Sequence, residues 1–353
     1  MKSGLAGIGI ILMAVGGGIN AVHAASFALP PAGTEIVGTV HVVHPRNGNT
    51  LLDIARHYDL GYQEITAANP GISVWLPPAD ARVVVPTEFI LPPKPWIGII
   101  VNIPERRLFY FPKPHHGAAP RVITFPLGIA REGWPTPLGK TRIIAKFKNP
   151  SWIVPQSIRR EHEQQDGRPF PRYFPPGPDN PMGMLALETG FSEIFIHGTD
   201  KPWGVGMRPS HGCLHLYPED AAELFPMVRR GTPVRIINNP VTAGRRHGKL
   251  YVAVFEPVAD YPHAESLPTR AVAALVPYLP HRADPLLSSA IDLQRVQAAV
   301  TRRSGIPTPV SSGVPPLDRM LAEIRAQPYT LPPYGAAANT GVAPGAGSGT
   351  VSE

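Results

Sequence analysis

The sequence is almost without cysteine, since its 353 residues contain a single one, Cys213. No internal disulfide can form, so the fold must depend on a hydrophobic core, which a 43% share of apolar residues can supply. In an exported protein a leftover thiol is a liability for wrong pairing, which makes a use for it more plausible. Cys213 is therefore the first candidate functional residue, with an inert buried thiol as the alternative.

Runs of basic residues are also lacking, although the net charge is +7 and the pI is about 9.6. No stretch of five consecutive basic residues occurs, and no nucleic-acid-binding module is recognisable. Nucleic acid is therefore not an expected partner. The positive charge suits an anionic cell envelope, and the alternative is the basic surface that is common in exported proteins.

The N-terminus lacks an apolar run that could span a membrane. Leu5 to Val15 falls short of the ~20 residues that a spanning helix needs, and no cysteine near it offers a lipid attachment point. Lys2 before this run and the small-residue pattern Val22-His23-Ala24 after it are typical of an export signal. We expect a signal peptide over residues 1–24, cleaved after Ala24, with an uncleaved membrane anchor as the alternative.

Residues 38–87 predict a small β-α-α-β unit. The expected elements are a strand over 39–43, a helix from Leu51 capped by Thr50 or Asn49, a helix over 62–68 and a strand over 82–86. The stretches "GNTLLDIARHYDLGYQEITAANP" and "VVVP" resemble a LysM module, the small fold that binds N-acetylglucosamine-containing glycans. The usual Asp before the Thr is Asn49 here, and the second half is longer.

Residues 95–240 predict a β-rich domain with many Gly and Pro breaks. The expected strands cover 97–102, 107–111, 121–126, 141–147, 193–197 and 233–237, and one clear helix begins at Pro218. A strand over 249–256 and helical segments form an extension over 241–304. Residues 305–353 are rich in Pro, Gly and Ser and predict a largely disordered tail with a short helical patch over 317–326.

Cys213 lies in "SHGCLHLYPED", between His211 and His215. Three hypotheses compete: a zinc site with His197 as a fourth ligand, an inert core thiol, and a nucleophile. Structural zinc ligands usually come in two separated pairs, and the polar neighbours argue against an apolar pocket. For a nucleophile, an imidazole would activate the thiol and a glycine would let the backbone N–H groups approach an oxyanion.

The histidine best suited to act as the base lies on another strand. His197 ends the apolar stretch of "FIHGTD" and precedes a glycine. A Cys-His pair of this kind suggests acyl transfer on a peptide-like carbonyl.

The block "IHGTDKPWGVGMRPSHGCLHLYPEDAAELF", with "GTPVRI" after it, resembles the L,D-transpeptidase catalytic domain, also called YkuD-type. In that family a histidine precedes Ser/Thr-His-Gly-Cys by a dozen or more residues, and twelve residues separate His197 from Ser210. "REGWPTPLG", "PPGPDNPMG" and "INNPV" resemble its envelope subgroup. The resemblance implies an α+β, mostly β fold: a β-α-α-β LysM-like module before a β-rich, sandwich-like catalytic domain.

The resemblance also implies residue roles. Cys213 would be the nucleophile and His197 its partner, oriented by the Gly198 carbonyl; Gly212 would help to form the oxyanion hole and His211 would support the pocket. The expected substrate-binding positions are Ser210, Arg208, Trp134 and His215. Ser210 is expected mainly to hold the turn, and a core Trp and a solvated Arg are the alternatives for Trp134 and Arg208.

One position departs from the family pattern, because His215 stands where the family usually has arginine. Histidine is half-charged near pH 6.5, whereas arginine is always charged. If this position holds a substrate carboxylate, activity should be weaker or more dependent on pH.

The resemblance implies a periplasmic enzyme that acts on peptidoglycan without a metal or other cofactor. Cys213 would attack the carbonyl of the third stem residue, D-Ala would leave, and a stem diaminopimelate or a lysine of an outer-membrane lipoprotein would resolve the thioester. Two alternatives stay open: a cysteine-dependent hydrolase or carboxypeptidase of the same fold, and a non-catalytic wall-binding scaffold.

Overall fold

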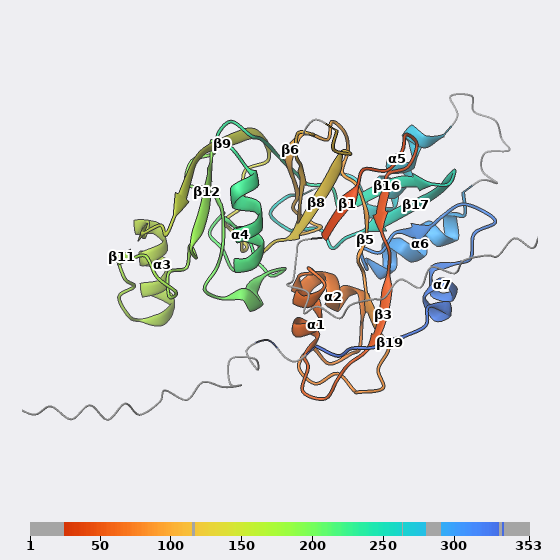
Figure 1. Cartoon of the computed structure of the whole chain (residues 1–353), viewed down its shortest axis with the longest axis horizontal. Coiled ribbons are helices and arrows are strands. Elements are labelled where there is room, and N and C mark those ends of the chain that lie inside the picture. Colours follow the sequence, from red (N-terminus) through yellow and green to blue (C-terminus); the bar gives the residue numbers. More distant parts are fainter. Residues whose placement is uncertain (1–24, 115–116, 263, 280–290, 332–333, 335–353) are drawn as a thin grey trace, which may run out of the picture.

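A computed structural model describes residues 25–114, 117–262, 264–279, 291–331 and 334 (Figure 1). The expected signal peptide and the end of the expected tail lie outside these residues. None of the described helices is both long and apolar enough to cross a bilayer.

A curled nine-stranded sheet forms the centre of the fold, so the chain is α+β and mostly β, as expected (Figure 1). Its order is β1 (Ala25–Ala28), β8 (Arg121–Pro126), β7 (Arg107–Phe111), β6 (Gly98–Asn102), β15 (Pro233–Ile237), β9 (Gly139–Lys148), β12 (Leu185–Thr189), β13 (Phe195–His197) and β14 (Leu214–His215). The pairs β15–β6 and β13–β14 are parallel, and the other pairs are antiparallel. The parallel pair at the sheet edge brings two distant sequence segments together.

The helix α4 (Pro218–Met227) packs against this sheet directly after β14. Its buried Leu224 and Phe225 join Leu187 of β12 and Ile196 of β13 in one apolar cluster. Each such side chain contributes about 1.5–3 kcal/mol when it is fully buried. The packing fixes the end of β14, and with it the loop that carries Cys213.

The N-terminal unit has the expected β-α-α-β order in β3 (His41–His44), α1 (Leu51–His57), α2 (Tyr62–Ala68) and β4 (Val83–Val85). Thr50 caps α1: its Oγ1 accepts from Asp53 N at 3.0 Å, and Asp53 Oδ2 accepts from Thr50 N at 2.8 Å. This reciprocal pair is a capping box and confirms Thr50 as the cap. A second small ladder joins β2 (Ile36–Gly38) to β5 (Glu88–Ile90).

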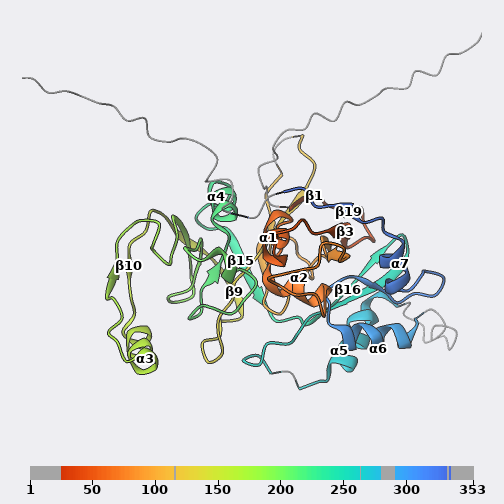
Figure 2. The same cartoon turned by 90° about the horizontal axis from the view of Figure 1, so that it is seen from below.

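The N-terminal unit shares its core with the central sheet. Leu51 and Ile54 of α1 lie in the same apolar cluster as Ile100 of β6 and Phe109 of β7. Figure 2 shows α1 and α2 beside β1 and β3, close against the body of the molecule. The N-terminal unit is therefore packed against the central sheet and is not joined to it by a linker alone.

The helix α3 (Gln156–Asp166) and the short pair β10 (Trp152–Ile153) and β11 (Tyr173–Phe174) were not expected. Only Ile158 is buried in α3, so its sequence has no apolar periodicity from which a helix could be predicted. Figure 1 shows α3 and β11 as an arm at one end of the molecule, beyond β12.

The C-terminal extension has its own core. Its strands β16 (Val241–Arg246), β17 (Lys249–Val254) and β18 (Thr308–Pro309) form a sheet covered by α5 (Leu267–Leu275), η2 (Val276–Tyr278) and α6 (Leu293–Arg302). The expectation of a disordered tail from 305 is wrong for residues 305–331. Here β18 pairs with β17, α7 (Leu317–Glu323) follows, and β19 (Gln327–Pro328) pairs with β3. Proline-rich chain can add to an exposed strand, and sequence composition does not reveal that partner.

Candidate functional site

The parallel pair β13–β14 brings the two halves of the candidate site together. His197 pairs with His215 in register, and Leu216 N donates to His197 O at 2.8 Å. Because aligned residues of neighbouring strands share a face, the two imidazole rings lie 4.5 Å apart. The SHGC turn directly precedes β14, so this strand pairing places the turn next to β13, which ends at His197.

His197 is held as a neutral base. Its side chain is buried, and its Nδ1 lies 2.6 Å from Gly198 O, which can only accept a hydrogen bond. Nδ1 therefore carries the proton and Nε2 is the unprotonated nitrogen. The backbone of Met182 also contacts the ring. Burial lowers the pKa of His197 to about 4, so the ring is neutral at physiological pH.

Cys213 lies at the mouth of the site with its side chain partly exposed. Its Sγ is 3.5 Å from Glu193 O, to which the thiol donates. The surrounding protein desolvates the sulfur and raises the pKa of Cys213 to about 11. At rest the Cys213 thiol is therefore protonated and the His197 imidazole is neutral.

Three hydrogen bonds fix the turn that carries Cys213. Ser210 Oγ donates to Cys213 O at 2.6 Å, and Thr136 Oγ1 donates to Gly212 O at 2.7 Å. Arg131 N donates to Ser210 O at 2.9 Å from the neighbouring loop. Ser210 is buried, and its hydroxyl is engaged in the turn.

Gly212 has a backbone conformation that needs glycine. Its φ is +112°, and a Cβ added there would approach Ile194 Cδ1 to 2.9 Å. The backbone conformation and, to a lesser extent, the neighbouring side chain therefore disfavour any larger residue at this position.

His211 contacts the arm that carries α3. Its Nε2 donates to Glu161 Oε2 of α3 at 2.8 Å, and Arg131 pairs with the same carboxylate. Trp134 contacts the ring edge-to-face at a centroid distance of 4.8 Å. Burial, together with the charge of Arg131 and the neighbouring His162, lowers the pKa of His211 to about 4, so the neutral ring is the donor.

Comparisons of the sequence with known proteins identify a family. The YkuD family, described as the L,D-transpeptidase catalytic domain, matches residues 97–236. The probable L,D-transpeptidase ErfK/SrfK of Escherichia coli (strain K12) is 35% identical over 298 residues, covering 82% of this chain and 92% of that protein. The chain belongs to the L,D-transpeptidase family.

Other members of the family are also similar. The probable L,D-transpeptidase YbiS of Escherichia coli (strain K12) is 36% identical over 250 residues, covering 70% of this chain and 80% of that protein. Among solved structures, L,D-transpeptidase 3 from Mycobacterium tuberculosis aligns with a TM-score of 0.29 and 19% identity, over 46% of this chain and 73% of that chain. The prediction of an L,D-transpeptidase that acts on peptidoglycan is confirmed.

One expected substrate-binding residue of this L,D-transpeptidase, Arg208, holds neighbouring loops in place. Arg208 donates from Nε to Ala130 O at 2.9 Å and pairs through its terminal nitrogen with Asp260. Asp260 also accepts from Gly133 N at 2.7 Å, so it ties the loop of Trp134 to the chain beyond β17. Trp134 is partly buried against His211 at the edge of the site.

His215 does not behave as an arginine substitute. Its ring lies against His197, and its backbone exchanges hydrogen bonds with Gly128 at 2.8 Å in each direction. Burial, and then the neighbouring His197 and His211, lower its pKa well below the ordinary value. The ring stays neutral across the physiological range, so the expected pH dependence from this position is not supported.

Several functional neighbours could not be read from the sequence. They are Arg131, Thr136, Glu161, Glu193 and Asp260, which contact the site residues from the surrounding loops and α3. "REGWPTPLG" holds Arg131 and Thr136, so this motif was the available signal. Among the described residues, no three His, Cys, Asp or Glu side chains converge in the manner of a metal site.

Proposed function

We propose that Cys213 is the acylated nucleophile of this L,D-transpeptidase and that His197 is its base. The observation that carries this assignment is the hydrogen bond from His197 Nδ1 to Gly198 O, because it leaves Nε2 unprotonated. A neutral base is needed, since the thiol itself is protonated at rest.

In the proposed first step, Cys213 Sγ forms a bond to the carbonyl carbon of the third stem residue as its proton passes to His197 Nε2. The tetrahedral intermediate collapses when the C–N bond to the terminal D-Ala breaks and the departing amine takes that proton. The product is a thioester on Cys213 and free D-Ala. In the second step an acceptor amine forms a C–N bond to the thioester carbonyl carbon and loses a proton to His197. The C–S bond then breaks, and His197 returns that proton to Cys213 Sγ.

The turn supports oxyanion stabilisation by the backbone. Thr136 holds Gly212 O at 2.7 Å, and a trans peptide directs the next N–H away from that oxygen. The Cys213 N–H therefore points to the side of the turn opposite Thr136, where the carbonyl oxygen of a bound acyl group would lie. The removal of one such donor typically costs ~10²–10³ in rate.

The proposed acceptor is an amine, either a stem diaminopimelate or a lysine of an outer-membrane lipoprotein. The arm that carries α3 contacts the site, because the carboxylate of Glu161 pairs with His211 and Arg131. Exposed apolar side chains lie on the arm and the neighbouring loops, at Ile153, Tyr173, Met184 and Trp203. Such a surface favours a protein or peptide partner over water alone.

We also propose that residues 38–87 are a LysM-like module that binds glycan and that residues 1–24 are a signal peptide cleaved for export to the periplasm. A cleft beside the module supports glycan binding: it is lined by Ala25, Phe27, Gly38, Thr39, His41, His57, Tyr58, Asp59 and Thr87. His41 and Tyr58 stack there at a ring distance of 6.1 Å. Aromatic faces beside an open cleft suit sugar rings, which stack on such surfaces through their apolar faces.

A mass measurement with a carbapenem tests the proposed nucleophile. The native protein should gain one carbapenem mass on Cys213, and Cys213→Ala should gain none. Thr136→Val, which removes only the hydroxyl that holds Gly212 O, should still be acylated but more slowly. A native protein without an adduct would overturn the assignment and leave the scaffold hypothesis.

Analysis of sacculi then separates the possible acceptors. Purified protein incubated with sacculi should produce stem–stem links, or peptide–lysine links when a lipoprotein is added. Shortened stems without new links would identify the hydrolase alternative.

A further inference from the structure

A buried pair of carboxyl groups lies where the N-terminal unit meets α4, behind the catalytic turn. Asp59 follows α1 and Asp220 stands in the first turn of α4; they are 2% and 1% exposed. The two side chains are in direct contact, and burial raises the pKa of both. Neither residue takes part in the proposed chemistry of Cys213.

Each carboxyl group has an oxygen without a hydrogen-bond donor. Among the described residues, Asp59 Oδ1 and Asp220 Oδ2 are buried and have no such partner. A buried acceptor left unsatisfied costs about 1–3 kcal/mol, and more if it is charged. Two facing carboxylates therefore need either a shared proton or a donor that reaches both.

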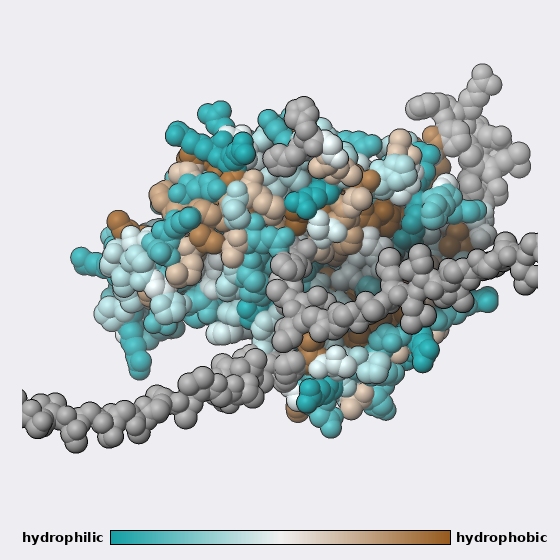
Figure 3. All heavy atoms as spheres, in the orientation of Figure 1, coloured by the Kyte–Doolittle hydropathy of each residue, from teal (hydrophilic) through white to brown (hydrophobic). Residues whose placement is uncertain are grey.

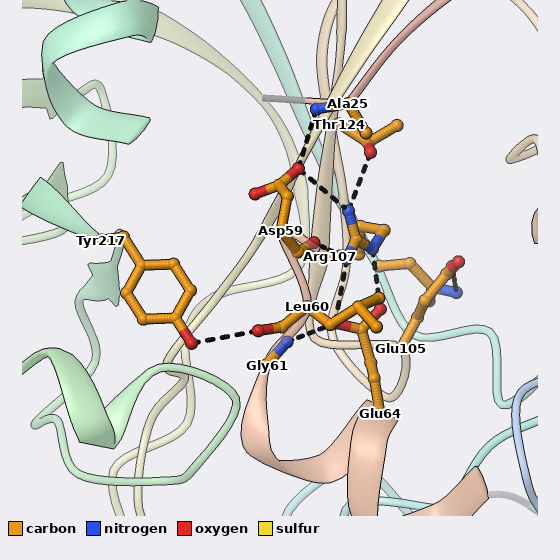
Figure 4. Close-up of polar contacts among 10 residues, drawn as sticks. Ala25, Asp59, Leu60, Gly61, Glu64, Glu105, Arg107, Thr124 and Tyr217 are labelled. Atoms are coloured by element: carbon orange, nitrogen blue, oxygen red, sulfur yellow. Dashed lines mark hydrogen bonds and ion pairs between the residues drawn. The ribbon is translucent and has the colours of Figure 1, made fainter. Parts of the chain in front are cut away.

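Positive charge is scarce around this pair. Arg107 is fully buried and lies 3.9 Å from Asp59 Oδ2, but its Nε is already 2.8 Å from Glu64 Oε1 (Figure 4). Arg107 also donates to Asp59 O at 2.7 Å and to Thr124 Oγ1 at 2.8 Å, so its donors are engaged. One guanidinium thus faces four carboxyl groups, those of Asp59, Glu64, Glu105 and Asp220.

The missing cation has a source in the chain itself. Ala25 N lies 3.0 Å from Asp59 Oδ2 and donates to it at the start of β1 (Figure 4). Ala25 is also the residue that would begin the chain after cleavage at the expected site, which follows Ala24. The strand pairing Ala25↔Thr124 holds this nitrogen in place through the register of β1 with β8.

We propose that Asp59 and Asp220 form a binding site for a primary ammonium group, that of the N-terminus released at Ala25. The proposal rests on the export and cleavage proposed above. Water adds across the bond between Ala24 and Ala25, Ala24 leaves as a carboxylate, and Ala25 N becomes an ammonium after it takes up a proton. Its three N–H bonds replace one, so it can donate to Asp59 and turn toward Asp220.

Binding of this ammonium would make the stability of the turn that carries Cys213 depend on cleavage after Ala24. Asp220 belongs to the helix that directly follows β14, and Tyr217 before it donates to Leu60 O at 3.0 Å across the same interface. Arg56 adds an ion pair to Glu219 at 2.6 Å. The mature N-terminus would therefore stabilise the joint between the N-terminal unit and the segment that carries Cys213.

The sign of the pH dependence distinguishes an occupied site from an empty one. Charged or titratable groups face the pair from every side, besides Asp59 and Asp220 themselves: Arg107, Glu64, Tyr217, Glu219 and Tyr334. While Ala25 N remains in a peptide bond, burial raises the pKa of Asp59 to about 7, so stability falls as pH rises from about 4 through 7. A docked ammonium removes that loss. The pKa of the docked ammonium is itself raised in the folded state. Its contribution to stability is therefore complete below about pH 8 and is lost as the pH rises further.

The test compares two exported forms of the full chain. The first has its natural cleavage site, and the second carries Gly-Ser inserted between Ala24 and Ala25, so that its ammonium is displaced. Intact mass establishes each N-terminus first, which separates a failure of the cleavage proposal from a failure of the site. We expect the α-amine of the first form to react about tenfold more slowly with an acylating reagent at pH 7.5 than that of the inserted form.

Thermal unfolding gives a second measure. The natural form should melt at least about 4 °C higher at pH 7, and the gap should close toward pH 4 and again above pH 9. Asp59→Asn should remove both the protection and the gap, whereas Glu219→Gln, a neighbouring carboxylate outside the pair, should keep both. Equal reactivity of the two α-amines, or a gap that does not vary with pH, would overturn the proposal.

Discussion

The proposed catalytic pocket and the interface around Arg107 both place polar side chains in largely buried surroundings, yet the cost of burying these groups is met in opposite ways. In the pocket, burial keeps Cys213, His197 and His215 neutral, with pKa values of about 11 for the thiol and about 4 for His197. At the interface, burial is offset by a charged pair between Arg107 and Glu64 at 2.8 Å. The side chains of the pocket are neutral at rest, whereas the interface joins the N-terminal unit to the central sheet through buried ion pairs.

The difference teaches where substitutions should affect stability and where they should affect rate. A neutral pocket residue can be replaced without leaving a bare charge behind, so the main loss is chemical. A buried ion that loses its partner leaves an uncompensated charge, so the main loss is folding free energy. The following predictions test that division, from the largest expected effect to the smallest.

Arg107→Met should cost about 3–5 kcal/mol of folding free energy, because Glu64 and Asp59 would stay buried without their cation. Urea unfolding measures the loss. The control is Arg319→Met, which removes an exposed pair with Glu323 and should change stability by less than about 0.5 kcal/mol. A small loss at Arg107 would mean that the interface carboxyl groups stay protonated without it.

His197→Gln should slow carbapenem acylation of Cys213 by about 10²–10⁴, because the proton acceptor is removed while a hydrogen-bonding side chain remains. Time-resolved intact mass measures the rate. The unfolding midpoint should change little in comparison with Arg107→Met, since no charge is exposed. A large loss of stability with a normal acylation rate would show that His197 supports the fold and does not accept the proton.

Gly212→Ala should cost about 1–3 kcal/mol and slow acylation, because φ of +112° is strained for alanine and the new methyl would meet Ile194. Ile194→Val removes the approaching Cδ1 and should restore part of the loss, while the backbone strain remains. The matched control is Gly204→Ala in the preceding segment, where the nearest atom is Pro209 Cγ at an ordinary 3.6 Å. Equal effects at both glycines would contradict the argument from backbone conformation.

The acylation rate should vary by less than about threefold between pH 5.5 and 9. His197 must be neutral to accept the proton and becomes charged only below its pKa of about 4, and the Cys213 thiol ionises only near its pKa of about 11. The rate should therefore fall on the acid side alone, toward pH 4. A rise with a midpoint between pH 6 and 8 would show instead that an ion pair forms in the free enzyme.

Much of the fold could be predicted from the sequence because many elements carry their own signal. Thr50 and Asp53 form a capping box, and the strands 107–111, 121–126 and 233–237 are found where they were expected. The helix α3 gave no such signal, since its residues are polar throughout and only Ile158 is buried. The ordered residues 305–331 were missed for a related reason: β19 depends on β3, which lies far away in the chain.

The candidate site divides in the same way. Cys213 and His197 stand out in the sequence because a lone cysteine and a distant histidine fit one chemistry. Glu161, which receives His211, belongs to an unpredicted helix, and Asp260 meets Arg208 from beyond β17. Nothing in the spacing of these residues brings them together.

The sequence by itself indicated the family, the proposed nucleophile and base, and the order of most elements, because local pattern and composition carry that information. Only the tertiary structure decided the state of each group. His215 is neutral because it is buried against His197, Cys213 keeps its proton because it is desolvated, and Ala25 meets Asp59 because β1 joins the sheet beside β8. Desolvation and proximity depend on the whole fold, and no stretch of sequence contains them.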